Sequence, residues 1–219
     1  MNADYESRGF PDRYAAGRSL AQALSGYRNE PHLLVLGLPR GGVPVAHEVA
    51  EALDAELDVL VVRKLGVPWQ PELAMGAVAS GGVSVLNEDV IRQLAIVGDD
   101  LEVVTERETG EVKRRERVYR GDRPEPKIAG RTVILVDDGI ATGSTMKAGV
   151  EALKQEGASR VVVAVPVAPA GAREEFEGLA DEFVAVIEPD NMMAVGAWYL
   201  DFGQTSDDEV RELLISHRC

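Results

Sequence analysis

Five short apolar runs, rich in β-branched residues, recur along the chain and are separated by stretches with helical spacing. The runs are 32–36, 57–62, 132–136, 161–165 and 183–187. None alternates strictly between apolar and polar residues, which is typical of parallel strands covered on both faces. Apolar residues between the runs, as in 46–53 and 146–153, follow the period of a helix. This strand–helix alternation predicts an α/β fold with a mostly parallel central sheet.

Residues 72–120 interrupt the alternation and are predicted to form an insertion. Within it, residues 74–79 and 83–86, joined by Ser80-Gly81-Gly82, have the pattern of a β-hairpin. The charged run 99–120 that follows predicts a long exposed helix. We expect the insertion either to close the site over its ligand or to form a dimer contact.

The chain has 219 residues, enough for a substantial core, and we expect residues 1–219 to form a single domain. Its net charge of −14 argues against binding to nucleic acid or to an anionic membrane. No apolar run approaches the roughly 18 residues that span a bilayer. The polar N-terminus lacks the apolar stretch of a secretory signal, and the single Cys219 cannot form an internal disulfide. These features favour the cytoplasm.

The charge is unevenly distributed along the chain. Residues 174–209 contain eleven acids and no Lys or Arg, whereas residues 107–127 contain eight Lys or Arg. The basic stretch has two interpretations, a solvated helix face or a local site for an anionic ligand.

One strand–loop–helix segment, residues 132–145, carries most of the chemistry. Its apolar strand ends in Asp137 and Asp138, a loop with Gly139 follows, and Ala141-Thr142-Gly143-Ser144-Thr145 opens a helix. Backbone amides at a helix N-terminus bind phosphate, while paired carboxylates bind vicinal hydroxyls or a metal ion. Because ligands of open α/β sheets bind at the carboxyl ends of strands, the segment predicts a site for a ribose 5-phosphate.

Two further loops follow predicted strands. Arg40-Gly41-Gly42 comes after the first strand, and its glycines let backbone amides approach an anion closely. Arg63 and Lys64 come at the end of the second run and would bring cations to the same sheet edge. The alternatives are a tight strand-to-helix turn for the first loop and a solvated pair of charges for the second.

The run from Val136 to Thr145 resembles the phosphoribosyl pyrophosphate (PRPP) motif of type I phosphoribosyltransferases, in which a strand leads into two acids and a Thr-Gly-x-Thr loop. Receiver domains also pair acids after a strand, but near the N-terminus and without that loop. The resemblance implies a three-layer α/β/α domain. It also implies an enzyme that transfers ribose 5-phosphate from PRPP to a nitrogen nucleophile such as a nucleobase, with release of pyrophosphate and Mg²⁺ as cofactor.

The resemblance further implies a role for each matched residue. The 5-phosphate would be bound by Ala141, Thr142, Gly143, Ser144 and Thr145. The pyrophosphate would be bound by Arg40, Gly41, Gly42 and Lys64. Asp137 and Asp138 would hold the ribose hydroxyls and Mg²⁺, and together with Arg40 they are the candidate catalytic residues. Family members often have a cis peptide in the turn at this arginine, so we expect one between Pro39 and Arg40.

Residues 188–205 resemble the hood of the 6-oxopurine enzymes, which contacts the base. The candidates for base binding are Val195, Trp198 and Tyr199. Both aromatic side chains have the alternative of belonging to the core, and Asp201 is a candidate ligand for a second Mg²⁺. Ala141 points to a different subfamily, because the 6-oxopurine enzymes have an acid there and the adenine enzymes do not. The acceptor base therefore stays open.

Two other functions stay open. One is a non-catalytic regulatory protein that binds PRPP or a nucleotide, and the other is a phosphate-ester enzyme with the same cradle. We expect PRPP and a small nitrogenous acceptor as ligands, and a homodimer as the assembly. Tyr119 and Arg120 are candidates for a lid over PRPP. The chain's three histidines, at positions 32, 47 and 217, lack the spacing of a zinc protease motif.

Overall fold

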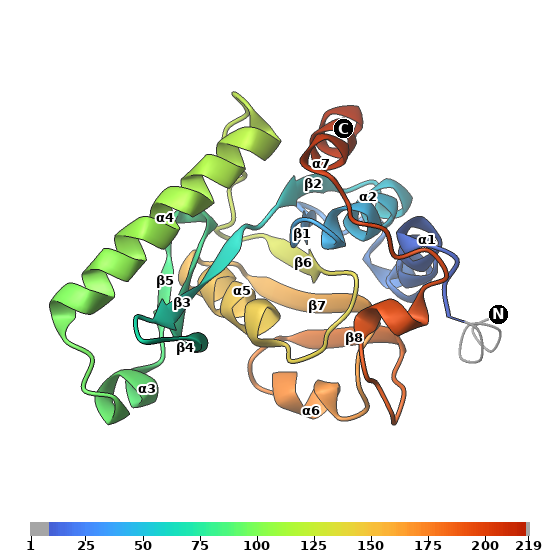
Figure 1. Cartoon of the computed structure of the whole chain (residues 1–219). Coiled ribbons are helices and arrows are strands. Elements are labelled where there is room, and N and C mark those ends of the chain that lie inside the picture. The colour runs from blue at the N-terminus through green and yellow to red at the C-terminus, as the bar shows by residue number, and fades with distance from the viewer. Residues whose placement is uncertain (1–8, 218–219) are drawn as a thin grey trace.

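Five parallel strands form the central sheet of the computed structural model, which describes residues 9–217. The strands are β1 (Leu34–Gly37), β2 (Glu56–Val59), β6 (Thr132–Val136), β7 (Arg160–Val167) and β8 (Glu182–Ile187). Their order in the sheet is β2-β1-β6-β7-β8, and every neighbouring pair is parallel (Figure 1). The predicted α/β fold with a mostly parallel sheet is therefore confirmed.

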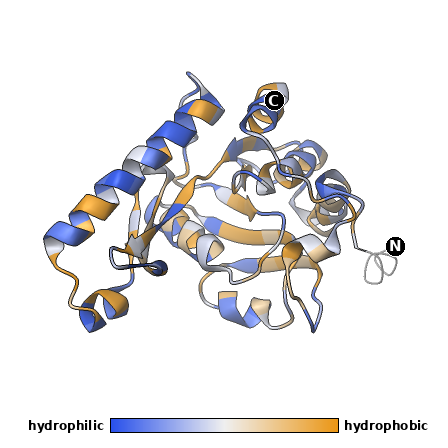
Figure 2. Ribbon diagram, in the orientation of Figure 1, coloured by the Kyte–Doolittle hydropathy of each residue, from blue (hydrophilic) through white to orange (hydrophobic). Residues whose placement is uncertain are grey.

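Helices cover both faces of this sheet. They are α1 (Arg13–Ala23), α2 (Gly42–Leu53), α5 (Ser144–Gln155), α6 (Ala172–Phe176) and α7 (Asp207–Ser216). Successive strand residues point to opposite faces, so on β6 Ile134 packs in the cluster with α1 and α2, whereas Leu135 packs in the cluster with α5 and α6. The result is the expected three-layer α/β/α arrangement. Figure 2 shows β7 as hydrophobic, as a strand buried on both faces requires.

A second, three-stranded antiparallel sheet lies to one side of the first (Figure 1). Its strands are β3 (Val62–Val67), β4 (Gln70–Ala79) and β5 (Ser84–Leu86). The predicted hairpin is present, with Ser80–Gly82 (η3) forming the connection and positive φ at both glycines. The helix α5 packs against this small sheet and α4 (Gly98–Arg120) packs on it as well, while α3 (Glu88–Gln93) connects β5 to α4.

The prediction of one strand over residues 57–62 is wrong. The parallel pairing of β2 with β1 ends at Val59, and β3 begins at Val62 as part of the antiparallel sheet. Val61, between the two strands, is already bonded to the end of the hairpin. The Ser80 backbone N–H donates to the Val61 carbonyl, and the Ser80 hydroxyl accepts from the Val61 N–H. Arg63 and Lys64 therefore lie within β3, and not at the end of a parallel strand.

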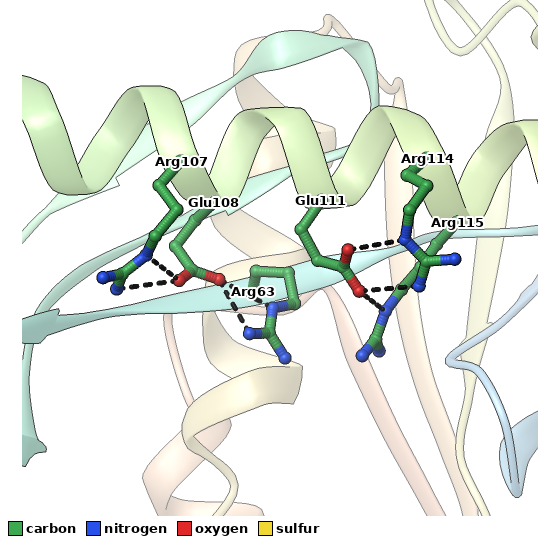
Figure 3. A network of polar contacts seen from close by, with 6 residues as sticks. All are labelled: Arg63, Arg107, Glu108, Glu111, Arg114 and Arg115. Atoms are coloured by element: carbon green, nitrogen blue, oxygen red, sulfur yellow. Dashed lines mark hydrogen bonds and ion pairs between the residues drawn. The ribbon is translucent and has the colours of Figure 1, made fainter.

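The charged helix α4 is present as predicted, and Figure 2 shows most of it as hydrophilic, but it is not exposed on every side. Its inner face carries charged residues that find ionic partners. Glu108 accepts from Arg63 and from Arg107, and Glu111 accepts from Arg114 and Arg115 (Figure 3). Burial of the Glu108 carboxylate is tolerated because it is paired, whereas Glu111 is only partly buried and pairs with Arg114 and Arg115 near the surface.

The lid candidates Tyr119 and Arg120 are buried at the end of α4. Arg120 donates from Nε to Asp58 over 2.8 Å and from Nη1 to Glu116 over 2.9 Å. The Tyr119 hydroxyl donates to Asp207 on α7 over 3.1 Å. Both side chains hold α4 against its neighbours, so the expectation of a lid at these two residues is wrong.

The described part of the chain contains no helix that is both long enough and apolar enough to cross a membrane. Cys219 and the first eight residues lie outside the described range.

Candidate functional site

The loops that follow β1 and β6 meet at the carboxyl edge of the central sheet. An added Cβ at Gly41 would lie 2.1 Å from Oδ2 of Asp138, and one at Gly42 would lie 2.9 Å from Cα of Asp137. Only glycine fits at both positions, because the first loop passes directly over the acid pair. The Pro39–Arg40 peptide bond in this loop is cis, as expected. These two loops therefore come together as their sequence positions predict.

The two acids lie at the base of this junction. The backbone N–H of Asp138 donates to Oδ1 of Asp137 over 2.9 Å. Burial raises the pKa of Asp137 well above its usual range, and the neighbouring Asp138 raises it further. Burial also raises the pKa of Asp138, although Arg13 opposes that rise. Closely spaced, partly desolvated carboxylates are poised to accept hydroxyl donors or a cation.

Arg13, which no motif in the sequence indicates, is the basic partner of the pair. Its Nε donates to Oδ2 of Asp138 over 2.8 Å, and its Nη1 donates to the Gly203 carbonyl over 2.6 Å. Its guanidinium also lies 4.0 Å from the ring centroid of Phe202. The only local signal is Asp12, which caps α1 by accepting from the Ala15 N–H. That signal fixes where the helix begins but not what Arg13 contacts.

The loop after the acids ends in a sharp turn into α5. Gly143 has φ of 69°, in the left-handed region, and Ser144 is the first residue of the helix. The loop is held in place because the Ile140 N–H donates to the Val167 carbonyl. Thr142 and Ser144 have their hydroxyl oxygens 3.1 Å apart beside the helix N-terminus. Amides and hydroxyls therefore converge where the helix dipole favours an anion.

The two cations of β3 face opposite sides of the small sheet. Arg63 faces α4, where its Nε donates to Glu108 over 2.8 Å. Lys64 lines a cavity of about 450 Å³ together with Ser144 and Lys147 of α5. The alternation of side chains along a strand causes this split. Lys64 thus borders the N-terminus of α5, whereas Arg63 is directed away from it, contrary to expectation.

Arg40 lies at the rim of the site. Its side chain is half exposed, and its Nη1 is 3.7 Å from Oδ1 of Asp207 at the start of α7. An exposed pair at that distance is weak, so the guanidinium can turn toward an anion at little cost.

The hood segment packs over the same loops. Val195, in η4 (Val195–Trp198), is so close to Gly139 that an added Cβ there would lie 2.6 Å from Cγ1 of Val195. The Tyr199 hydroxyl donates to the Asp138 carbonyl over 2.5 Å, and its ring is buried against Phe10. Tyr199 is therefore a core residue, which was the alternative to its predicted role in base binding. Trp198 is partly buried in the same cluster.

Asp201 lies near the end of the hood segment, on an exposed stretch of chain. Its Oδ1 accepts from the Gly203 N–H over 3.0 Å, and its own N–H donates to the Pro11 carbonyl. Gly203 is also the residue whose carbonyl accepts from Arg13. The segment that carries Asp201 is thus linked to the acid pair through Arg13.

Known proteins match this chain in sequence and in fold. The family model described as phosphoribosyl transferase domain matches residues 69–196, which include the acid pair and the loop into α5. A Mycobacterium tuberculosis H37Rv protein, named as a phosphoribosyl transferase, is 50% identical over 201 residues. That alignment covers 92% of this chain and 45% of the relative, so the chain spans about half the length of the curated relatives it matches.

A solved structure matches over nearly the whole length of both chains. It is the crystal structure of TT1426 from Thermus thermophilus, which is 46% identical to this chain. The superposition has a TM-score of 0.85 and covers 95% of this chain and 98% of the other. The two chains are therefore similar in sequence as well as in fold.

Proposed function

The chain belongs to the phosphoribosyltransferase family, and on that premise we propose that it transfers ribose 5-phosphate from PRPP to a nitrogen nucleophile, releasing pyrophosphate. One observation carries the proposal. The glycine turn 40–42, the acids 137–138 and the loop into α5 meet at one sheet edge. Those three elements correspond to the diphosphate, the diol and the 5-phosphate of PRPP.

The 5-phosphate end of PRPP suits the loop 141–145. Backbone amides at the start of α5 would donate to phosphate oxygens, and the hydroxyls of Thr142, Ser144 and Thr145 would add further donors. The loop itself carries no acidic side chain, so nothing in it repels the anion.

The ribose and the metal suit the acid pair. Asp137 and Asp138 offer oxygen atoms only, which is the donor chemistry that Mg²⁺ prefers. Asp201 in the hood is a further candidate oxygen ligand. When bound, Mg²⁺ would offset the negative charge of the pyrophosphate. The acids would accept from the ribose hydroxyls and orient the sugar, and Arg13 would keep Asp138 ionised.

The pyrophosphate would leave against the turn 40–42. The Gly41 amide together with the Arg40 guanidinium would stabilise its charge, and Lys64 would add a cation from the small sheet. The Gly42 N–H already donates to the Leu38 carbonyl over 3.0 Å, so Gly42 would contribute by letting the turn pass close to the acids. Groups held in place before the reaction stabilise developing charge most effectively. Positioning and electrostatics would thus provide most of the catalysis.

The acceptor is proposed to be a nucleobase held under the hood. Val195 and Trp198 are the apolar side chains of η4 available to contact it, since Tyr199 is buried. The protein is further proposed to act as a homodimer, which gel filtration with light scattering tests directly.

The decisive experiment is incubation of the full chain with PRPP, Mg²⁺ and a panel of nucleobases, with pyrophosphate measured. Pyrophosphate release that depends on one base supports transfer. The second candidate function is regulatory PRPP binding, in which the same loops and acid pair would hold PRPP without transferring its ribose 5-phosphate group. Tight PRPP binding without release for any base would support that function instead.

A further inference from the structure

Outside the proposed PRPP site, α2 and the end of α7 bring two histidines and a glutamate together. His47 and Glu51 lie one turn apart on α2, and His217 follows the last turn of α7. One ligand atom from each of the three side chains lies within 4.8 Å of the other two. Sequence spacing gave no hint of this, because 170 positions separate the two histidines.

His217 is held in one orientation by two contacts. Its Nε2 lies 2.7 Å from the Ala55 carbonyl, and its Nδ1 lies 2.9 Å from Oε1 of Glu51. A carbonyl only accepts, so Nε2 carries the hydrogen, and in a neutral imidazole Nδ1 is then a lone pair. That lone pair faces a carboxylate, which also only accepts. Either a proton on Nδ1 or a metal ion beside the two atoms satisfies both of them.

His47 provides the second unusual nitrogen. Its Nδ1 is buried, and no hydrogen-bond partner reaches it among residues 9–217. Buried polar atoms are almost always paired, so each exception calls for an explanation. The two imidazole rings lie 5.7 Å apart between centroids and nearly at right angles. One ring nitrogen of His47 lies within 4.8 Å of the ligand atoms of Glu51 and His217, so a cation bound there would have His47 within reach.

We propose that His47, Glu51 and His217 form a binding site for a divalent transition-metal ion, with Zn²⁺ the best match. Two imidazoles and one carboxylate are a common zinc ligand set, whereas Mg²⁺ and Ca²⁺ prefer oxygen atoms throughout. The hydrogen bond from His217 Nε2 to a backbone carbonyl is the usual outer-shell contact that orients a metal-bound imidazole. The Glu51 side chain is 58% exposed, which leaves an open route for the ion.

The ion would fasten α7 to α2. The first residue of α7, Asp207, accepts from Tyr119 of α4 and lies 3.7 Å from Arg40 of the pyrophosphate turn. Fixing α7 would therefore also restrict the movement of Asp207, and with it the contact that Asp207 makes with Arg40 at the edge of the proposed PRPP site. The site touches neither the acid pair nor the loop into α5, so its existence does not depend on the proposed transferase activity.

Metal binding is tested on chelator-stripped, untagged full chain by competition with a chromogenic zinc indicator. All proteins carry Cys219→Ser, because a thiol binds zinc by itself. We expect one zinc per chain, with affinity at least about tenfold weaker in His47→Ala and His217→Ala. His32→Ala is the matched control, since His32 is the chain's one other histidine and is exposed. It should bind zinc like the parent.

Glu51→Gln separates ligation from folding. The exposed glutamine keeps the size of the side chain but loses its charge, so the variant should fold and still bind zinc at least about tenfold more weakly. Zinc should raise the melting temperature of the parent and of His32→Ala but not of Glu51→Gln. The proposal is overturned if the parent does not bind micromolar zinc. Equal zinc binding by the parent and all three ligand variants would overturn it as well.

Discussion

Nε of Arg13 lies 2.8 Å from Oδ2 of Asp138, which joins the first turn of α1 to an acid 125 positions further along the chain. The side chains are only 12% and 15% exposed, so water screens the pair weakly. The N-terminal helix is therefore part of the candidate site. Arg13 on this helix both neutralises the acid and, by donating to the Gly203 carbonyl, links the acid to the end of the hood segment.

Replacing Arg13 with methionine should raise the pKa of Asp138, because Arg13 opposes the effect of burial on that carboxyl. The acidic limb of the pH profile of PRPP use should then move to higher pH. The unfolding free energy at neutral pH should fall by about 3 kcal/mol or more, since a partly buried charge loses its partner. Arg18→Met on the same helix is the control, because its pair with Glu48 is largely exposed and should contribute under about 1 kcal/mol. An unshifted pH profile in Arg13→Met would remove Arg13 from the site.

Gly143→Val should weaken PRPP binding at least about tenfold, because the variant should lose several of the hydrogen bonds from the loop to the phosphate. The β-branched residue cannot adopt the φ of 69° easily, so the turn that aims the amides should be lost at a cost of about 1–3 kcal/mol. Gly157→Val is the matched control, with φ of 83° just past the other end of α5 and only ordinary contacts around an added Cβ. Both variants should lose similar stability by chemical denaturation. Equal PRPP affinities in calorimetry would contradict the assignment of the phosphate site.

Gly41→Ala should abolish PRPP use, because the added methyl would lie 2.1 Å from the Asp138 carboxylate and must displace either the turn or the acid. Gly110→Ala is the control, a glycine-to-alanine change that is expected to stabilise the protein. Its Cβ would point into open space among the described residues in the middle of α4, and it should raise the unfolding free energy by about 0.5–1 kcal/mol. Denaturant melts and initial rates of pyrophosphate release measure both effects. Normal turnover in Gly41→Ala would show that the loops separate in solution.

The raised pKa of Asp137 has a consequence for stability. The folded state holds its proton to higher pH than the unfolded state, whose ordinary value is about 3.9. The stabilisation from this group is therefore complete below that value and is lost as pH rises toward the folded-state pKa. Asparagine has no proton to lose, so Asp137→Asn should not be destabilised as the pH rises. The melting temperature of the variant minus that of the parent should therefore increase from pH 4 upward, while PRPP use disappears. A constant difference across this range would mean that Asp137 is ionised in the fold as in the unfolded chain.

The local patterns of the sequence were sufficient for the mostly parallel central sheet, the hairpin of β4 and β5, the long helix α4 and the loop into α5, but not for β3. The acids 137–138 follow a buried strand and precede glycine and hydroxyl residues, so this part of the site consists of residues that are adjacent in the sequence. The junction near Val59 was not predictable, because an apolar run does not show where one set of strand pairings stops and the next begins. The partner that Val61 takes there is Ser80, which lies 19 positions further along the chain.

Contacts between distant segments account for the remaining differences. Tyr199 was a candidate for base binding by its place in the hood, but the fold directs its hydroxyl to the Asp138 carbonyl. Arg120 belongs to a basic stretch, yet Asp58 and Glu116 are both buried beside it. Charge along a helix shows which residues need partners, and only the tertiary fold shows whether those partners are ligands or other side chains.

The central claim is that one cleft binds both ends of PRPP, and a displacement titration tests it most directly. PRPP with Mg²⁺ is titrated calorimetrically into the full chain alone, and then in the presence of saturating ribose 5-phosphate or saturating pyrophosphate. We predict one PRPP per chain, with each competitor alone weakening PRPP binding because each occupies one end of the same site. PRPP binding that is absent at millimolar concentration, or that neither competitor affects, would contradict the assignment of this cleft.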